Sequence, residues 1–381
     1  MSMRGKIKAT AMVVVIVLAT LFAAPVSAIS DEEVAAPSAI LMEPNTGKIL
    51  YEKNANEQRP CASITKVMTL LLVMEAIDSG KISLEDQVAA SAHAASMGGS
   101  DIWLKEGEVM SVNDLIKATV IMSANDAAVV LAEHVYGTED EFVKQMNIRA
   151  KQLGMNDTVF QNCNGLDEDG HITTAHDVAL MSGALIAHEK IFDYTLTWMD
   201  YLRDGQTQLV NTNKLIRRYK GITGLKTGTT GQAGSCITAT AKRDDLNLVA
   251  VVLGCATTDE RFAGATTLLD YGFANFAFIT LPIPELGTVP VSGGMQAQVQ
   301  AQCGQTAQVL LPKGKEAGIK SQVQLSESIQ APVEQGQILG RVSYTLDGEE
   351  IAGYNVTAKE SVAKMHFGAV FAILLKSLFN W

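Results

Sequence analysis

The chain has 381 residues, of which 47% are apolar and 19% are charged, and its formal net charge is -11 at pH 7. This length allows a sizeable buried core and favours two domains, and the composition excludes an intrinsically disordered protein. The acidic charge, without a basic stripe in the sequence, argues against nucleic acid as a partner.

The first 28 residues predict a secretory signal peptide. Three cations precede an apolar stretch over residues 9–24, which ends in Pro25 and the small-residue sequence Val26-Ser27-Ala28. This order favours cleavage after Ala28 over the alternative, a retained membrane anchor, because the apolar stretch is short for a span. Loss of these cations leaves 27 basic and 41 acidic side chains, a charge of -14. We therefore expect a protein secreted across the cytoplasmic membrane.

The cysteines and histidines show no pattern typical of a metal site. Five scattered cysteines with no C-x-x-C pair do not make a disulfide framework, and their odd number leaves at least one thiol free. The six histidines lack a zinc-binding spacing. We expect no metal and no cofactor. Cys61 is interpreted as a small buried side chain, since no motif supports a nucleophile there.

The next part of the chain predicts a hairpin followed by helices. Apolar runs at residues 38–42 and 49–51 flank a Pro-Asn-Thr-Gly turn and predict the hairpin. Residues 64–77 are apolar enough for a buried helix. Residues 84–160 are interpreted as mostly helical, with a capping serine at Ser111.

Two strands and a closing helix follow. Residues 236–241 and 247–255 are rich in β-branched side chains and predict an antiparallel pair, and residues 261–278 predict a helix packed on it. The fold class expected is α+β, with an antiparallel sheet flanked by helices and a helical insertion around residues 80–180.

The C-terminal third has a different texture. Residues 285–357 alternate short apolar runs with turn residues and predict a small all-β domain. Residues 360–381 predict an amphipathic helix, but the uninterrupted apolar run within it, residues 367–375, is too short to span a bilayer. We interpret this segment as an interfacial membrane anchor; the alternative is a core helix that docks on its own domain.

Three short motifs occur in order along the chain. They are Ser-x-x-Lys at residues 63–66, Ser-x-Asn at residues 123–125 and Lys-Thr-Gly at residues 226–228. This ordered triplet is typical of enzymes acylated by D-Ala-D-Ala peptides and by β-lactams. The first two patterns recur at residues 361–364 and 111–113, so the order and spacing of the three carry the inference.

The first motif has the chemistry of an activated nucleophile. A serine hydroxyl needs a base, and residues three apart share a helix face, so Ser63 and Lys66 can come within hydrogen-bond reach. Lys66 is a base only when neutral, which requires burial or a nearby cation such as Lys226. The alternative makes Ser63 a helix cap, Ser123 a polar loop residue and Lys226 a solvated strand residue.

The sequence around these motifs resembles that of the low-molecular-weight penicillin-binding proteins, which are serine-type D-Ala-D-Ala carboxypeptidases of the peptidase S11 family. The resemblance is close over residues 36–278 and includes several further segments: residues 62–69, 122–128, 164–166, 171–177, 211–215 and 224–228. It implies a penicillin-binding/β-lactamase-like catalytic domain over residues 29–280. It also implies peptidoglycan stem peptides ending in D-Ala-D-Ala as substrate and β-lactams as inhibitors.

The resemblance gives a role to each motif residue. Ser63 would be acylated by the penultimate D-Ala, Lys66 would take its proton, and Ser123 would relay a proton to the leaving amine. The resemblance also implies a set of substrate-binding residues. Asn125 would bind the peptide amide, and Lys226 and Thr227 would bind the terminal carboxylate, with Arg261 near it. The N–H of Thr229 would complete the oxyanion hole together with the N–H of Ser63.

Several alternatives stay open beside this reading. A D,D-endopeptidase and a transpeptidase would use the same site. A class A-like β-lactamase would need a Glu-x-x-Leu-Asn loop, which does not occur between Asn125 and Lys226. An inactive cell-wall scaffold is the alternative of a different class. Thr212 and Thr229 depart from family members that have a cation and a histidine there, so substrate detail and turnover rate are open.

Overall fold

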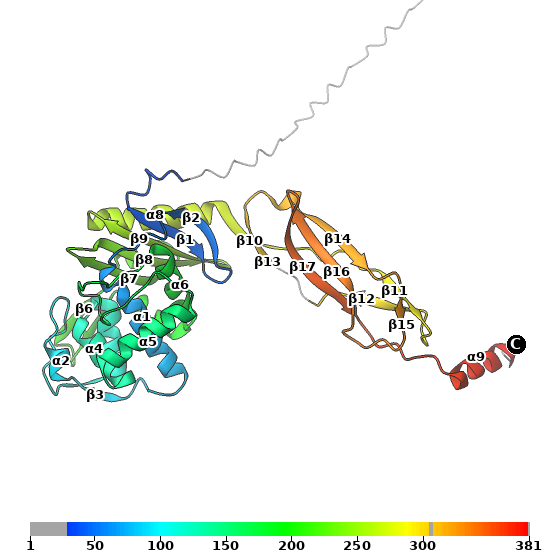
Figure 1. Cartoon of the computed structure of the whole chain (residues 1–381), viewed down its shortest axis with the longest axis horizontal. Helices are drawn as coiled ribbons and strands as arrows, with labels where there is room; N and C mark the ends of the chain where they lie inside the picture. Colours follow the sequence, from blue (N-terminus) through cyan, green and yellow to red (C-terminus); the bar gives the residue numbers. More distant parts are fainter. Residues whose placement is uncertain (1–28, 305–307, 380–381) are drawn as a thin grey trace, which may run out of the picture.

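The computed structural model describes residues 29–304 and 308–379, so the expected signal peptide lies outside the described residues. Figure 1 shows a domain of sheet and helices, an elongated all-β domain beside it, and a terminal helix at the far end of the β domain. This arrangement places the whole β domain between the first domain and the C-terminus.

A five-stranded antiparallel sheet forms the centre of the N-terminal domain, in the order β2-β1-β9-β8-β7. The expected hairpin is β1 and β2, and the expected strand pair lies within β8 and β9. Strands β1 and β9 lie near opposite ends of the domain's sequence, but they pair with each other, with Ser38 opposite Leu253. The bounds are β1 Ser38–Glu43, β2 Lys48–Lys53, β7 Ile222–Thr230, β8 Gly234–Arg243 and β9 Leu246–Cys255.

Helices cover both faces of this sheet (Figure 1). Helix α8, Thr258–Asn275, packs on β8 and β9, and its capping box at Thr257 fixes where it begins. On the other face, α1 and α6 separate the sheet from the helical insertion. The helices of that side are α1 Lys66–Asp78, α3 Val112–Lys117, α4 Asn125–Tyr136, α5 Glu139–Gln152 and α6 Ala175–Ile186.

The insertion differs from the sequence expectation in detail. Ser111 caps α3 as expected, since its Oγ accepts from the N–H of Asp114 at 3.1 Å. The expected helix over residues 64–77 begins with a 3-10 turn, and α3 runs into a π-helical turn. Short strands interrupt the region interpreted as mostly helical. The short elements are η1 Ala62–Thr65, η2 Ala118–Met122, η3 Glu189–Ile191, η4 Lys214–Arg217, α2 Ala92–Ala95, α7 Phe192–Thr195, β3 Gln87–Ala89, β4 Val109–Ser111, β5 Met199–Leu202 and β6 Thr207–Val210.

The β domain has its own core. Its six-stranded sheet has the order β14-β16-β17-β12-β11-β15, and buried valines such as Val289, Val342 and Val356 fill the interior. The strands of this sheet are β11 Thr288–Ser292, β12 Gln298–Gln302, β14 Lys320–Leu325, β15 Ile329–Gln330, β16 Ile338–Leu346 and β17 Glu349–Ala358. Strand β13, Gln308–Pro312, lies outside this sheet, and a 3-10 turn η5 spans Glu316–Gly318.

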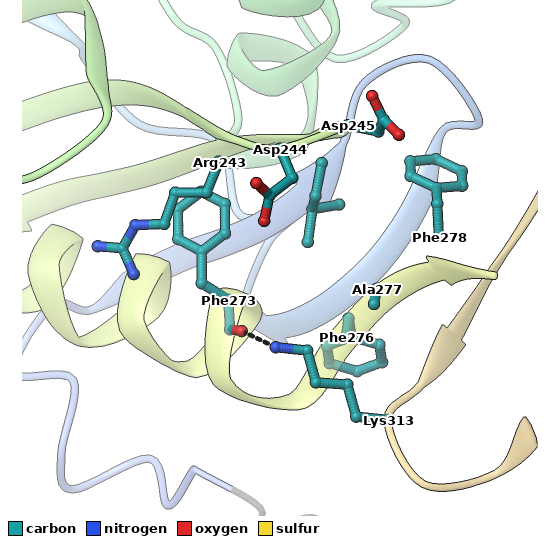
Figure 2. A pocket seen from close by; sticks show the side chains of 9 residues that line it. Arg243, Asp244, Asp245, Phe273, Phe276, Ala277, Phe278 and Lys313 are labelled. Atoms are coloured by element: carbon teal, nitrogen blue, oxygen red, sulfur yellow. Dashed lines mark hydrogen bonds between the residues drawn. The ribbon is translucent and has the colours of Figure 1, made fainter.

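The junction between the domains corrects one expectation. The closing helix ends at Asn275, not at Phe278, because Phe276 takes an extended conformation and starts strand β10, Phe276–Thr280, which pairs with β13. The ammonium of Lys313 donates to the carbonyl of Phe273 at 2.6 Å. Figure 2 shows this bond beside a pocket of about 320 Å³ between the β8–β9 turn and β10, which no residue of the three motifs lines.

The C-terminal helix α9, Phe367–Phe379, follows the β domain. The side chains of Phe367, Phe371 and Leu374 are 84%, 52% and 54% exposed, so these three apolar side chains are not packed against the β domain. In the part of the chain that the structure describes, none of the helices has the length and apolar character needed to cross a bilayer.

Candidate active site

Ser63 and Lys66 meet where the η1 turn passes into α1. The Nζ of Lys66 lies 3.1 Å from the Oγ of Ser63. It also donates to the Oδ1 of Asn125 at 2.5 Å and to the carbonyl of Asn164 at 2.6 Å. The lysine is fully buried. The acceptors on Asn125 and Asn164 therefore hold the amine beside the serine hydroxyl.

Burial sets the charge state of Lys66. Loss of solvation lowers the pKa of its amine from 10.5 to about 7, although nearby acidic groups, among them Asp101 and Asp126, act in the opposite direction. The sequence left open whether burial or the charge of Lys226 would lower this pKa; burial is the main cause. A neutral amine beside the hydroxyl is the state that a general base needs.

The second motif has a strained backbone. The π-helical turn η2 ends at Met122, and Ser123 takes a left-handed conformation with φ 66° before α4 begins. A serine in this region is uncommon and marks a position that the surrounding structure enforces. The Oγ of Ser123 is buried and has no hydrogen-bond partner among the described residues. The hydroxyl is thus available to a bound molecule.

Asn125 links the second motif to a loop. Its backbone N–H donates to the carbonyl of Ser100 and its side-chain amide donates to the carbonyl of Gly98, both at 2.6 Å. The amide oxygen faces Lys66. The side chain is therefore held from two sides.

The third motif lies on β7, directly against η1. A Cβ added to Gly228 would lie 2.7 Å from the carbonyl oxygen of Cys61 and 3.0 Å from the backbone nitrogen of Ser63, so only glycine allows this approach. Lys226 is 1% exposed, and its Nζ donates to the carbonyl of Thr227. Burial, and then repulsion by Lys66 and by a nearby arginine, lower the pKa of Lys226.

Polar contacts join the remaining predicted residues to this strand. The Oγ1 of Thr227 donates to the Oγ1 of Thr212 at 2.8 Å. The guanidinium of Arg261 donates to the carbonyl of Gly228 at 2.9 Å and to the Oγ1 of Thr229 at 2.8 Å. Arg261 is 6% exposed. Arg261 therefore stabilises the C-terminal end of β7 through these hydrogen bonds.

Sequence reasoning missed the supporting groups. Asn164 contributes a backbone carbonyl, which no residue type announces, and Gly165 beside it has φ 83°, with a Cβ position 2.0 Å from the oxygen of Ala62. The Nε2 of His171 lies 2.8 Å from the Oγ1 of Thr65, and burial lowers the pKa of this histidine to about 4. The sequence had singled out these segments only as part of the resemblance.

Thiols near the site are not alternative nucleophiles. Burial raises the pKa of Cys61 to about 12 and that of Cys163 in the same direction. Cys61, Cys163, Cys236 and Cys255 are free thiols. Within the described residues, no group of three or more histidine, cysteine or acidic side chains has an arrangement that could hold a metal ion.

Comparisons with known proteins agree with this geometry. Residues 25–257 match the family model "D-alanyl-D-alanine carboxypeptidase", and residues 284–364 match "Penicillin-binding protein 5, C-terminal domain". The chain is 42% identical to D-alanyl-D-alanine carboxypeptidase DacF of Bacillus subtilis, covering 91% of this chain and 90% of that protein. It is 34% identical to DacC of Escherichia coli, covering 94% and 93% of the two chains.

Solved structures show the same likeness. Penicillin binding protein 5 from Haemophilus influenzae is 30% identical, has a TM-score of 0.75, and is matched over 88% of this chain and 100% of its own. Penicillin-binding protein D2 from Listeria monocytogenes, in its ampicillin-bound form, is 34% identical with a TM-score of 0.58, over 63% of this chain and 98% of its own. The second match leaves out about a third of this chain.

Proposed function

Because the chain belongs to the D-alanyl-D-alanine carboxypeptidase family of serine hydrolases, peptidase S11, we propose that Ser63 is its nucleophile and Lys66 its general base. The protein is a penicillin-binding carboxypeptidase that acts on the cell wall. The contacts around Lys66 support the proposed roles of its reacting residues.

Acylation begins with proton transfer. Neutral Lys66 takes the proton of Ser63, whose Oγ attacks the carbonyl of the penultimate D-Ala. The backbone N–H groups of Ser63 and Thr229 hold the oxyanion that forms. The bond to the terminal D-Ala then breaks: its nitrogen takes a proton from Ser123, and Ser123 takes back the proton that Lys66 holds, so that Lys66 is neutral again. Water then attacks the ester and gives a proton to Lys66, which passes it to the Oγ of Ser63 as the ester bond breaks.

Residues of β7 and of the second motif bind the substrate. Lys226 and Thr227 bind the terminal carboxylate, and the negative charge of a bound carboxylate raises the pKa of Lys226. The amide of Asn125 binds the peptide backbone. Arg261 acts through Thr229 and the carbonyl of Gly228, holding the strand end in place, and adds positive charge near the carboxylate.

The observation that carries this assignment is the fully buried amine of Lys66, 3.1 Å from the Oγ of Ser63. The test is to incubate the purified protein with a labelled penicillin and, separately, with a peptide that ends in D-Ala-D-Ala. We expect label on the wild type but not on Ser63→Ala, and release of D-Ala by the wild type alone. A folded Ser63→Ala protein that still takes up the label would refute the assignment.

Peptidoglycan lies outside the cytoplasm, and so does the protein. We further propose that residues 1–28 direct export and that α9 holds the protein at the membrane surface. The exposed side chains of Phe367, Phe371 and Leu374 support an interfacial helix. The β domain, between α9 and the sheet-and-helix domain in Figure 1, would then hold the active site away from the bilayer.

The test of the anchor is fractionation of cells that express the full chain. Removal of residues 360–381 should release the protein from membranes. The double variant Phe371→Asp and Leu374→Asp should do the same without shortening the chain. Membrane binding that survives both changes would exclude α9 as the anchor.

A further inference from the structure

Trp103 is exposed in a way that its neighbours are not. Its side chain is 73% exposed, whereas Ile102 and Leu104 on either side are 0% and 4% exposed. Its φ is 55°, in the left-handed region, which is unfavourable for a bulky side chain. A strained conformation of this kind persists only where surrounding contacts enforce it, and such positions concentrate at functional sites.

Two anchors enforce it, the buried Asp126 and the partly exposed Arg203. The carboxylate of Asp126 accepts hydrogen bonds from the backbone N–H of Ile102 at 3.1 Å and of Leu104 at 3.0 Å, one on each side of the tryptophan. From the β5–β6 turn, Arg203 donates to the carbonyl of Ile102 at 3.0 Å and to Glu108 at 2.7 Å. The backbone on either side is fixed, and the indole is left outside.

The indole lines a pocket of about 430 Å³ together with Lys105, Glu106, Gly107, Glu108 and Arg203. This volume is in the range of small-molecule sites, roughly 300–1,000 Å³. Two cations and two carboxylates balance one another, and Arg203 and Glu108 are already paired. The pocket therefore suits a neutral ligand with many hydroxyl and amide groups better than a charged peptide.

A short stretch of backbone links the pocket to the active site. Ser100, three residues before Trp103, accepts the backbone hydrogen bond of Asn125, and Asp126 follows Asn125 directly. Three residues of chain reach at most about 11 Å. A pentapeptide stem has three residues before the acylated D-Ala, with a similar reach of about 11 Å, and beyond them comes the sugar to which the stem is attached.

We propose that Trp103 and this pocket bind the N-acetylated sugar that carries the stem peptide. The proposal rests on the carboxypeptidase function above. The indole face packs against the C–H face of a sugar ring, as aromatic faces attract the positive edges of neighbouring groups. Glu108 and Arg203 lie where they can bond hydroxyl and acetamido groups. The enzyme then binds the sugar as well as the stem peptide.

The experiment compares D-Ala release from a free pentapeptide and from the same pentapeptide on its N-acetylated disaccharide. For the wild type we expect a kcat/KM about tenfold higher with the disaccharide, through a lower KM. Trp103→Ala should lose this advantage but keep its rate with the free pentapeptide, and its rate of penicillin acylation, within about twofold of the wild type. Trp103→Phe should keep part of the advantage. Trp103→Gly should lose it as well while melting no lower than the wild type, because glycine suits φ 55°.

The opposing results are distinct. No sugar advantage in the wild type, or an advantage that survives Trp103→Ala, overturns the proposal. An equal fall for both substrates means that Trp103 contacts the stem peptide or supports the loop, which also overturns it. A wild type that releases D-Ala from neither substrate refutes the carboxypeptidase function instead. Sugar binding is then decided by calorimetry of the disaccharide-pentapeptide with Ser63→Ala, with and without Trp103→Ala: about tenfold weaker binding in the double variant supports it, and equal binding refutes it.

Discussion

The rate of acylation should rise with pH and reach half its plateau near pH 7. Lys66 must be neutral to take the proton of Ser63, and burial lowers its pKa from 10.5 to about 7. At pH 7 about half of the lysine is then neutral, against roughly 0.03% for a lysine with a pKa of 10.5, a gain of roughly 1,500-fold in the active form. Protonation removes the base, so the rate falls as pH falls.

The assay is the second-order rate constant for acylation by a chromogenic or fluorescent penicillin, measured from pH 5 to pH 10 on the free enzyme. The rate at pH 6 should be about one tenth of the plateau. His171 does not produce this limb, because its pKa is lowered to about 4. Lys226 is buried beside Lys66 and repels it, so the midpoint belongs to the pair. A flat profile, or a midpoint near pH 10, would refute the reasoning.

Three further substitutions test the geometry. Lys226→Ala should raise the KM for carboxylate-ending peptides by about 100-fold, since a charged hydrogen bond contributes up to about 3 kcal/mol; an unchanged KM would contradict this role. Gly228→Ala places a Cβ 2.7 Å from the oxygen of Cys61 and should slow penicillin acylation by at least about 100-fold, whereas Gly231→Ala, with no atom within 4 Å of its Cβ position, is the matched control and should not. Gly165→Ala places a Cβ 2.0 Å from the carbonyl oxygen of Ala62 at a residue whose φ is 83°, and should lower the free energy of unfolding by about 2 kcal/mol or more in urea titrations. Equal stability of the variant and the wild type would show that the loop adapts.

The sequence predicted which side chains meet at the candidate site but not what holds them. Ser63, Lys66 and Lys226 could be singled out because their residue types and order are typical of the chemistry proposed. The carbonyl of Asn164 could not, because every residue has a carbonyl. The left-handed conformation of Ser123 was equally hidden, since serine has no general preference for that region.

The fold shows the same division. The hairpin β1–β2 and the pair β8–β9 have local apolar and turn patterns, and both were predicted. The position of β1 between β2 and β9 was not, because the register of Ser38 with Leu253 depends on packing between distant segments. The end of α8 was missed by three residues, since Phe276 and Phe278 continue an apolar pattern that suits a helix and a strand alike.

The contacts of Lys66 also make the site depend on the order in which the chain folds. Its amine bonds residues 59 and 98 positions later in the chain, and the sheet beneath it closes only when β9 joins β1. Pairings of such long range form late in folding. An exported chain that is still unfolded therefore carries an ordinary solvated lysine of high pKa and an unreactive serine. Reactivity towards peptides and β-lactams is acquired only when the domain is complete, so an unfinished chain is not inactivated in transit.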